Sequence, residues 1–182
     1  MEPESIWANG DAKDIVLELF PPCHLLDLGG GSGWLQQHVP EYKVTNIDRP
    51  FDLNKDVLPN ESNSVAGVVS FQVIEHLENP HHFVREIFRV LKPGARAVIT
   101  TPNPFHIFNK LTFLKNGEMF RYNDENDHVY VATKAIARKL FRQFASIETR
   151  YQYGYFPYRW LSWFAFPANE LFARNICWIL RK

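Results

Sequence analysis

Residues 26–33 read Leu-Asp-Leu-Gly-Gly-Gly-Ser-Gly, and they join a short apolar run to a segment of helical character that starts near Trp34. Glycines at such a turn let the backbone approach a ligand closely, because they have no side chain and accept positive φ angles. The first N–H groups of the following helix would face an anion. The stretch therefore predicts a strand, a ligand-binding turn and a helix. A glycine turn without a ligand is the alternative.

Strands and helices alternate along the rest of the chain. Short apolar runs and helical periodicity predict these elements. This alternation indicates an α/β fold in which helices cover both faces of a mostly parallel sheet. Residues 102–128 show no regular pattern. The expected strands cover 23–28, 43–47, 65–71, 95–101, 146–153 and 175–180, and the expected helices cover 11–20, 80–91 and segments that begin near 34 and 133.

Length and charge narrow the class of protein. A chain of 182 residues predicts one domain over residues 1–182. Twenty basic residues balance twenty acidic ones, so we expect no bulk binding of nucleic acid. The start, Met1-Glu2-Pro3-Glu4, is not followed by an apolar run of the kind that secretory signals carry. We therefore expect a cytoplasmic protein.

Aromatic side chains gather near the end of the sequence. They make up 15% of the chain, and 11 of them lie in residues 151–182. Residues 155–173 are predicted to form an insertion between the last two strands. One interpretation is that its aromatic side chains fill the hydrophobic core. Alternatively it forms a lid or a peripheral membrane contact, because Trp and Arg suit membrane surfaces. Its longest apolar run, residues 160–166, is too short to cross a bilayer, which takes about 20 residues.

The spacing of the glycines separates two classes of nucleotide-binding protein. A dinucleotide fingerprint needs a glycine three residues after Gly31, where this chain has Trp34. The pattern from Asp27 to Gly33 instead resembles motif I of class I S-adenosylmethionine-dependent methyltransferases. The resemblance implies a Rossmann-like sheet of the seven-stranded type and S-adenosylmethionine as cofactor. It also implies cofactor contacts from Asp27, Gly29, Gly31 and Gly33. An NAD(P)-dependent oxidoreductase is the disfavoured alternative.

Further motifs extend the resemblance and name more cofactor contacts. Asp48, at the end of the second strand, matches the acid that accepts hydrogen bonds from the ribose hydroxyls. Asp56 and Val57 match an acidic-x-Leu-Pro element that contacts adenine, and Phe71 and Gln72 match the segment after the family's fourth strand. The short stretch from Asp48 to Asp56 implies that the family's usual third strand is minimal or missing. The resemblance covers residues 11–153, with other matches at 71–77, 89–94 and 99–103.

Two histidines are the candidate catalytic residues. Methyl transfer is an in-line displacement that depends on alignment, and an oxygen nucleophile also gains from a base or a metal. Glu75, His76 and the distant His128 resemble the metal-binding pattern of small-RNA 2′-O-methyltransferases. Gln72 stands where that pattern has a first Glu, and a lost carboxylate weakens a site for a hard cation. Three roles are therefore possible for these residues. Glu75 and His76 form a purely structural pair, or His76 acts as a metal-free base, or the three residues bind a divalent metal, which we do not expect.

The region after the fourth expected strand, residues 95–101, bears on the choice of acceptor. Residues 102–128 would lie at the carboxyl ends of the strands, where open α/β sheets bind ligands. Residues 101–114 and 127–128 resemble bacterial methyltransferases of cell-surface polysaccharide and glycolipid pathways. The resemblance implies O-methylation of a small-molecule or lipid- or sugar-linked acceptor. A catalytically silent binding protein with the same fold is the alternative.

Overall fold

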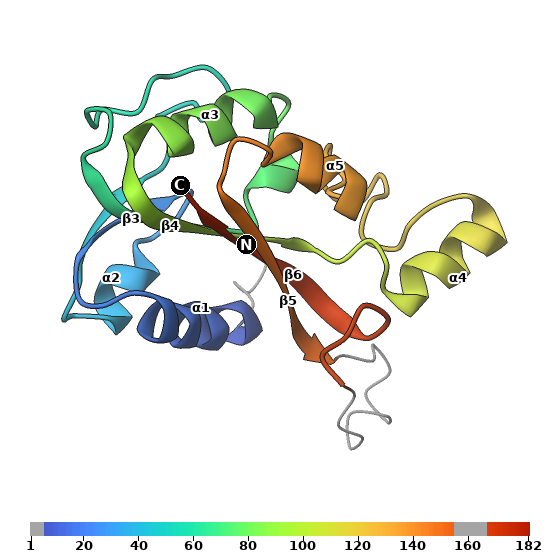
Figure 1. Ribbon diagram of the computed structural model, residues 1–182. Helices are drawn as coiled ribbons and strands as arrows, with labels where there is room; N and C mark the ends of the chain where they lie inside the picture. Colours follow the sequence, from blue (N-terminus) through green and yellow to red (C-terminus); the bar gives the residue numbers. More distant parts are fainter. Residues whose placement is uncertain (1–5, 155–166) are drawn as a thin grey trace.

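A six-stranded sheet forms the centre of the computed structural model, which describes residues 6–154 and 167–182 (Figure 1). The strand order is β2-β1-β3-β4-β6-β5. The first four strands in this order are parallel, and β6 runs antiparallel to β4 and β5. The strands are β1 (His24–Leu28), β2 (Lys43–Ile47), β3 (Val65–Phe71), β4 (Leu91–Pro102), β5 (Ser146–Gly154) and β6 (Ala173–Arg181).

Helices cover both faces of this sheet. Figure 1 shows α1 and α2 on one face and α3 and α5 on the other, while α4 projects away from the sheet. A short 3-10 turn, η1, follows β3. The helical elements are α1 (Ile6–Leu19), α2 (Trp34–His38), η1 (Ile74–His76), α3 (Pro80–Val90), α4 (Ile107–Asn116) and α5 (Lys134–Leu140).

Adjacent residues of the central strands point into two separate parts of the core. Leu26 and Val68 pack in the cluster under α3 and α5, whereas Leu25 and Val69 pack in the cluster over α1 and α2. A strand covered on both faces needs apolar residues at successive positions, because neighbouring side chains point to opposite faces. The near-continuous apolar runs of β1 and β3 follow from this.

The expected α/β fold with a mostly parallel sheet is confirmed. Residues 48–64, between β2 and β3, form turns and bends without a strand, so the shortened third-strand region leaves six strands. One part of the expectation is wrong: residues 107–116 form helix α4 inside the stretch for which no regular structure was expected. In addition, β4 starts at Leu91, before the expected Ala95.

The aromatic insertion predicted over residues 155–173 lies mostly outside the described residues, which resume at Pro167. Its roles as core filling, lid or membrane contact stay predictions. Among the helices that the structure describes, none combines the length and apolar character needed to cross a bilayer.

Candidate functional site

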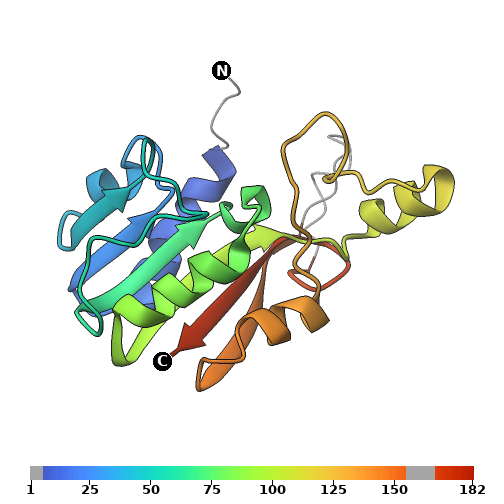
Figure 2. The same ribbon diagram turned by 90° about the horizontal axis from the view of Figure 1, so that it is seen from above.

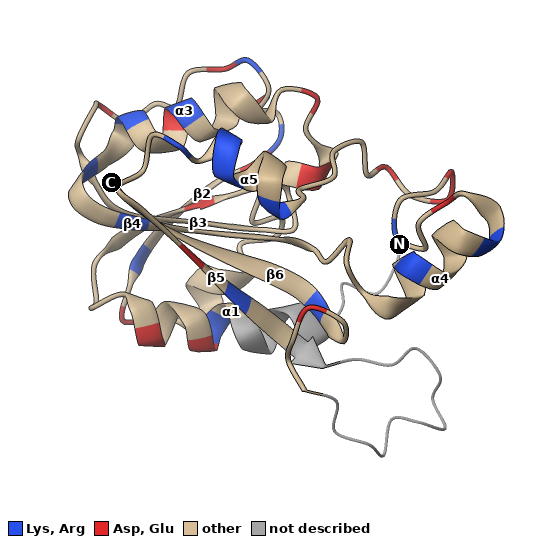
Figure 3. Ribbon diagram, turned by 45° about the vertical axis from the view of Figure 1, so that its right-hand side comes forward, with Lys and Arg blue, Asp and Glu red and all other residues tan. Residues whose placement is uncertain are grey.

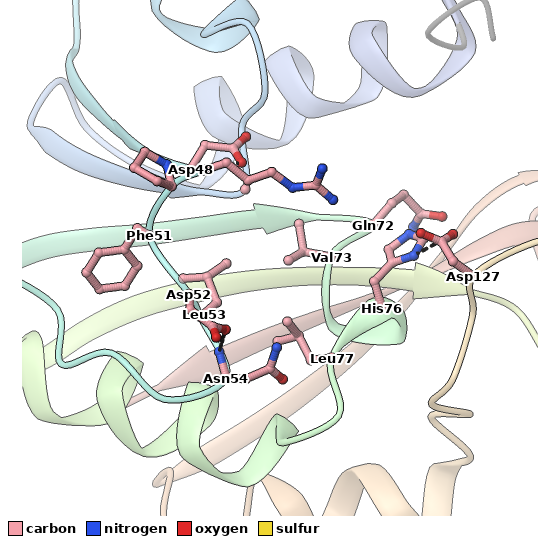
Figure 4. Close-up of a pocket in the computed structure, with 13 residues that line it drawn as sticks. Asp48, Phe51, Asp52, Leu53, Asn54, Gln72, Val73, His76, Leu77 and Asp127 are labelled. Carbon is pink, nitrogen blue, oxygen red and sulfur yellow. Dashed lines mark hydrogen bonds and ion pairs between the residues drawn. The ribbon is translucent and has the colours of Figure 1, made fainter. Parts of the chain in front are cut away.

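A cavity of about 480 Å³ opens at the carboxyl ends of the parallel strands (Figure 4). Its walls come from the turn after β1, the chain after β2, the chain after β3 and the loop before α5. This is the edge of the sheet where α/β proteins bind ligands. The lining residues are Gly29, Asp48, Arg49, Pro50, Phe51, Asp52, Leu53, Asn54, Gln72, Val73, His76, Leu77 and Asp127.

The glycine turn packs tightly against the chain that follows β3. Gly29 has a φ of +76°, and a Cβ atom built on it would lie 2.5 Å from Cγ2 of Val73. Gly31 also has a positive φ of +54°, but a Cβ atom there would meet nothing within 4 Å. Glycine at position 29 is therefore required by backbone geometry and by close packing, while open space lies beside Gly31.

The turn does not offer its glycine N–H groups to an anion. Gly29 donates to the Ile47 carbonyl (2.8 Å), and Gly30 donates to Oδ1 of Asn46 (3.2 Å). Gly31 donates to Oδ2 of Asp48 (2.5 Å), so three successive N–H groups bind partners from β2 and its end. These bonds fix the shape of the turn. The three glycines therefore contribute to ligand binding by letting a ligand come close to the backbone, and not by donating hydrogen bonds to it.

Asp48 joins the glycine turn to the cavity. Its Oδ2 accepts the Gly31 N–H, and its Oδ1 accepts the N–H of Arg49 at 2.6 Å. An ionised carboxylate offers about four lone-pair sites, so both oxygens retain capacity for hydroxyl donors. The residue lines the cavity, as a ribose acceptor must.

Asp27 lies beneath the turn and is almost fully buried. Burial, with a smaller contribution from the charge of Asp48, raises the pKa of its carboxyl group to about 7. The side chain lies close under Gly30, because a Cβ atom there would fall 2.2 Å from Oδ2 of Asp27. Asp27 is not among the residues that line the cavity. Its position supports the turn from below.

The raised pKa of Asp27 predicts a pH-dependent stability. The folded state keeps a proton between about pH 4 and 7 that the unfolded chain has lost, so this contribution fades as the pH rises through 7. Asp27→Asn is neutral throughout. We expect the free energy of unfolding of the wild type, relative to Asp27→Asn, to fall by roughly 3 kcal/mol between pH 5 and 8. Denaturant unfolding measures this difference, and parallel pH curves for the two proteins would contradict it.

The chain after β2 brings Asp52 and Leu53 to the cavity, and not Asp56 and Val57. Asp56 turns back to accept the Asp52 N–H at 2.8 Å, and the side chain of Val57 is 66% exposed. Hydrogen bonds from Asn54 lower the pKa of Asp52, so this carboxylate stays ionised. Asp56 and Val57 therefore lie outside the cavity lining, and the adenine contacts expected of them stay predictions.

A sharp turn after β3 directs three side chains into the cavity. Gln72 has a φ of +56°, the left-handed region that few residues other than glycine adopt. Its backbone N–H and its side-chain Nε2 both bind Oγ1 of Thr100 at 3.1 Å. Figure 4 shows Gln72, Val73 and His76 along the cavity wall. Phe71, the last residue of β3, does not line the cavity.

His76 makes a hydrogen bond to Asp127 that no sequence motif assigned. Its Nδ1 lies 2.9 Å from Oδ1 of Asp127, and both residues line the cavity (Figure 4). Because a carboxylate only accepts, Nδ1 carries the proton, and Nε2 is then the basic nitrogen of a neutral ring. The side chain of His76 is 35% exposed. Asp127 is 51 positions away from His76 in the sequence, and no local spacing shows that it faces this histidine.

His128 stands beside His76, with ring centroids 4.8 Å apart. Its Nδ1 lies 2.6 Å from the carbonyl oxygen of Arg121. That oxygen can only accept, so the Nδ1 atom donates and Nε2 is left as an acceptor. Burial is the main cause that lowers the pKa of His128. The ring is therefore neutral at pH 7.

Glu75 is a buried acid behind the two histidines. Burial raises the pKa of its carboxyl group to about 8. Neither carboxylate oxygen has a hydrogen-bond partner among residues 6–154 and 167–182, although buried polar atoms usually have one. One ligand atom each from Glu75, His76 and His128 lies within 4.8 Å of the others. The sequence thus placed three residues correctly in one cluster, and this donor set fits a divalent cation.

The structure brings together only part of the predicted cofactor set. Gly29, Asp48 and Gln72 line the cavity. The other residues lie next to it, beneath the glycine turn or away from the cavity. Phe51, Asp52, Leu53 and Asn54 were not assigned from the sequence, because they lie in the turns that replace the usual third strand. The predicted residues outside the lining are Asp27, Gly31, Gly33, Asp56, Val57, Phe71, Glu75 and His128.

Comparison with known proteins shows the family to which the chain belongs. The model of a family described as a methyltransferase domain matches residues 7–147. A "Probable S-adenosylmethionine-dependent methyltransferase" of Mycolicibacterium smegmatis is 54% identical over 46 residues, which make up 25% of this chain and 18% of that protein. A similarly named protein of Mycobacterium tuberculosis is 50% identical over 46 residues. The matched stretch therefore spans less than a fifth of the length of these curated relatives.

Solved structures share the fold across nearly the whole chain. A SAM-dependent methyltransferase from Archaeoglobus fulgidus superimposes with a TM-score of 0.70 at 13% identity, and covers 96% of this chain and 92% of its own. A phosphoethanolamine N-methyltransferase of Haemonchus contortus, bound to S-adenosylhomocysteine, has a TM-score of 0.52 at 17% identity. It covers 76% of this chain and 38% of its own. At these identities the likeness concerns the fold.

Proposed function

Because the chain belongs to the methyltransferase domain family, whose cofactor here is S-adenosylmethionine, we propose that it methylates an oxygen atom of a small acceptor linked to a lipid or a sugar. The observation that carries the proposal is the His76–Asp127 pair on the cavity wall. Such a pair prepares a ring nitrogen to take a proton from a hydroxyl group.

The cavity fits the cofactor. Gly29 allows the close approach of a ligand, Asp48 retains acceptor capacity for ribose hydroxyls, and Asp52 with Leu53 would contact the adenine ring. The volume of about 480 Å³ is in the range of sites for molecules of this size. When bound, the cofactor supplies an electrophilic methyl group on a sulfonium.

The residues of the chain then provide alignment and proton transfer. Nδ1 of His76 donates to Asp127, so its Nε2 can accept the hydroxyl proton of the acceptor while the carboxylate stabilises the charged ring. His128, neutral and beside His76, offers a second acceptor nitrogen for the same hydroxyl. Alignment of the two substrates in the cavity accounts for much of the remaining rate. No covalent intermediate with the protein is needed.

A divalent metal held by Glu75, His76 and His128 is the second mechanism. The two unpartnered oxygens of Glu75, within the part of the chain that the structure describes, favour it. Gln72 disfavours the metal mechanism, because its amide stands where the related pattern has a Glu carboxylate, the charged oxygen ligand that Mg²⁺ prefers. We propose the metal-free base as the working mechanism, and a chelation experiment separates the two.

Turnover is expected to survive the removal of metal. The purified protein is incubated with S-adenosylmethionine labelled in the methyl group and with a lipid and sugar-nucleotide extract, before and after exhaustive chelation. We expect labelled product in both reactions, with mass spectrometry placing the methyl group on oxygen. A loss of turnover that Mg²⁺ or Mn²⁺ restores would establish the metal mechanism. Label on nitrogen or carbon, or no label in any fraction, would contradict the proposed acceptor.

A further inference from the structure

Helix α4 has its polar side toward the protein and its apolar side toward solvent. Asn109 is 2% exposed, and its Nδ2 donates to the Asn103 carbonyl at 2.8 Å. Leu111 and Leu114, in contrast, are 53% and 82% exposed. A helix on the surface of a water-soluble domain normally shows the reverse arrangement, with its apolar stripe toward the core. The outer face of α4 therefore lacks an apolar partner among the described residues.

Polar contacts fix this orientation of the helix. Oδ1 of Asn109 accepts the Arg121 N–H at 3.3 Å, and Oγ1 of Thr112 accepts the Phe120 N–H at 3.1 Å. Both acceptors lie on the side of α4 that faces the following loop. A rotation that buried the leucines would break these bonds, so the outward apolar face is built into the fold.

The outward face has the composition of a helix that lies in a membrane interface. Ile107, Leu111 and Leu114 follow one another at i, i+4 and i+7 and so share one side of the helix. At about 100° per residue, Lys110 and Lys115 flank this stripe on its two sides. Lysines at such positions keep the ammonium group in the headgroup region while their stems cover apolar surface. Phe113 and Phe120, each more than half exposed, extend the apolar area.

We propose that α4 docks this protein on a lipid bilayer that contains anionic headgroups. Charge complementarity favours this occupant over a second copy of the chain. The helix holds two lysines and no acidic residue, and Figure 3 shows it in blue and tan only. A second copy packed on the same face would place lysines against lysines, whereas anionic headgroups pair with them. Exposed apolar patches rimmed by polar groups mark interaction sites of this kind.

The position of α4 suits an enzyme that works beside a membrane. β4 ends at Pro102, and α4 begins five residues later and projects beyond the carboxyl edge of the sheet (Figure 2). The chain between β4 and α5 contains α4 and also His128, whose Nδ1 donates to the Arg121 carbonyl. A bilayer at α4 thus lies on the side of the molecule that carries the cavity. The inference goes beyond the proposed function and rests on α4 alone.

Vesicle flotation of the full chain tests the proposal without any measurement of activity. Vesicles of phosphatidylcholine are compared with vesicles of phosphatidylcholine and phosphatidylglycerol. We expect flotation with the anionic vesicles and at least a tenfold loss of bound protein for Leu111→Ser/Leu114→Ser. Lys110→Glu/Lys115→Glu should lose binding to a similar degree. Leu17→Ser, at an exposed leucine of α1, is the matched control and should bind as the wild type does.

Several results would overturn the proposal. One is a wild type that stays at the bottom of the gradient with both kinds of vesicle. Another is flotation that the double serine variant keeps in full, because the lipid contact would then lie elsewhere. A third is a lipid-free dimer in sedimentation equilibrium that the serine changes dissociate, since the apolar face would then bind a second copy. Melting temperatures should match across all variants, because none of these side chains packs in the core.

Discussion

Asp48→Ala is expected to weaken the binding of S-adenosylhomocysteine by at least tenfold, which corresponds to about 1.4 kcal/mol. The carboxylate lines the cavity and accepts two backbone N–H groups, from Gly31 and Arg49. Its removal deletes the proposed ribose acceptor and also loosens the glycine turn that Gly31 belongs to. Isothermal titration calorimetry of the purified variant measures the loss.

Two control variants separate direct contact from a general disturbance. Asp48→Asn keeps an acceptor oxygen for a backbone N–H but not the charge, so it should fall between the wild type and Asp48→Ala. Val57→Ala alters a residue outside the cavity and should leave the affinity unchanged. An affinity that Asp48→Ala leaves intact would refute the ribose assignment. A strong loss in Val57→Ala would restore the original adenine assignment.

His76→Ala is expected to lower the rate of methyl transfer by about 10²-fold to 10⁴-fold, the usual contribution of a positioned base. The affinity for S-adenosylhomocysteine should change far less, because the residue acts on the acceptor. The initial rate is measured with labelled cofactor at saturating concentration. The expected loss is large because, among the described histidines, His76 is the one that pairs with a carboxylate on the cavity.

Three further measurements distinguish a base from a structural histidine. Added imidazole should restore part of the rate of His76→Ala, which a folding defect would not allow. Asp127→Asn keeps a hydrogen-bond acceptor without the charge and should show an intermediate loss. His81→Ala, at an exposed histidine of α3, should keep the full rate. A fully active His76→Ala would leave the Glu75–His76 pair with a structural role only.

The features that local sequence predicts well are those set by near neighbours in the chain. The strands over residues 43–47 and 65–71 have the expected bounds. The second of them is buried on both faces, which leaves a nearly continuous apolar run in its sequence. The glycine turn was expected for the same kind of reason, because glycines between a strand and a helix accept positive φ angles, and Gly29, Gly31 and Gly33 adopt them. The family and the cofactor were implied by the resemblance of residues 27–33 to a known motif, and both are confirmed.

The adenine contacts show where local spacing fails. Asp52 and Asp56 are both acids in a turn-rich stretch, and the sequence offers no period that ranks one over the other. In the structure, Asp56 accepts the Asp52 N–H, and Asp52 lines the cavity whereas Asp56 does not. The roles of both residues in binding stay predictions.

The sequence by itself determined the α/β fold and the glycine turn, because both depend on residue types at short spacing. Its resemblance to known methyltransferases indicated the family and the gathering of Glu75, His76 and His128, although no local spacing brings His128 to the other two. Tertiary structure alone decided that Asp127 pairs with His76, across 51 positions of sequence, and that the apolar side of α4 points outward. Periodicity shows that a helix has an apolar side. Which way this side faces depends on long-range contacts such as that between Asn109 and Asn103.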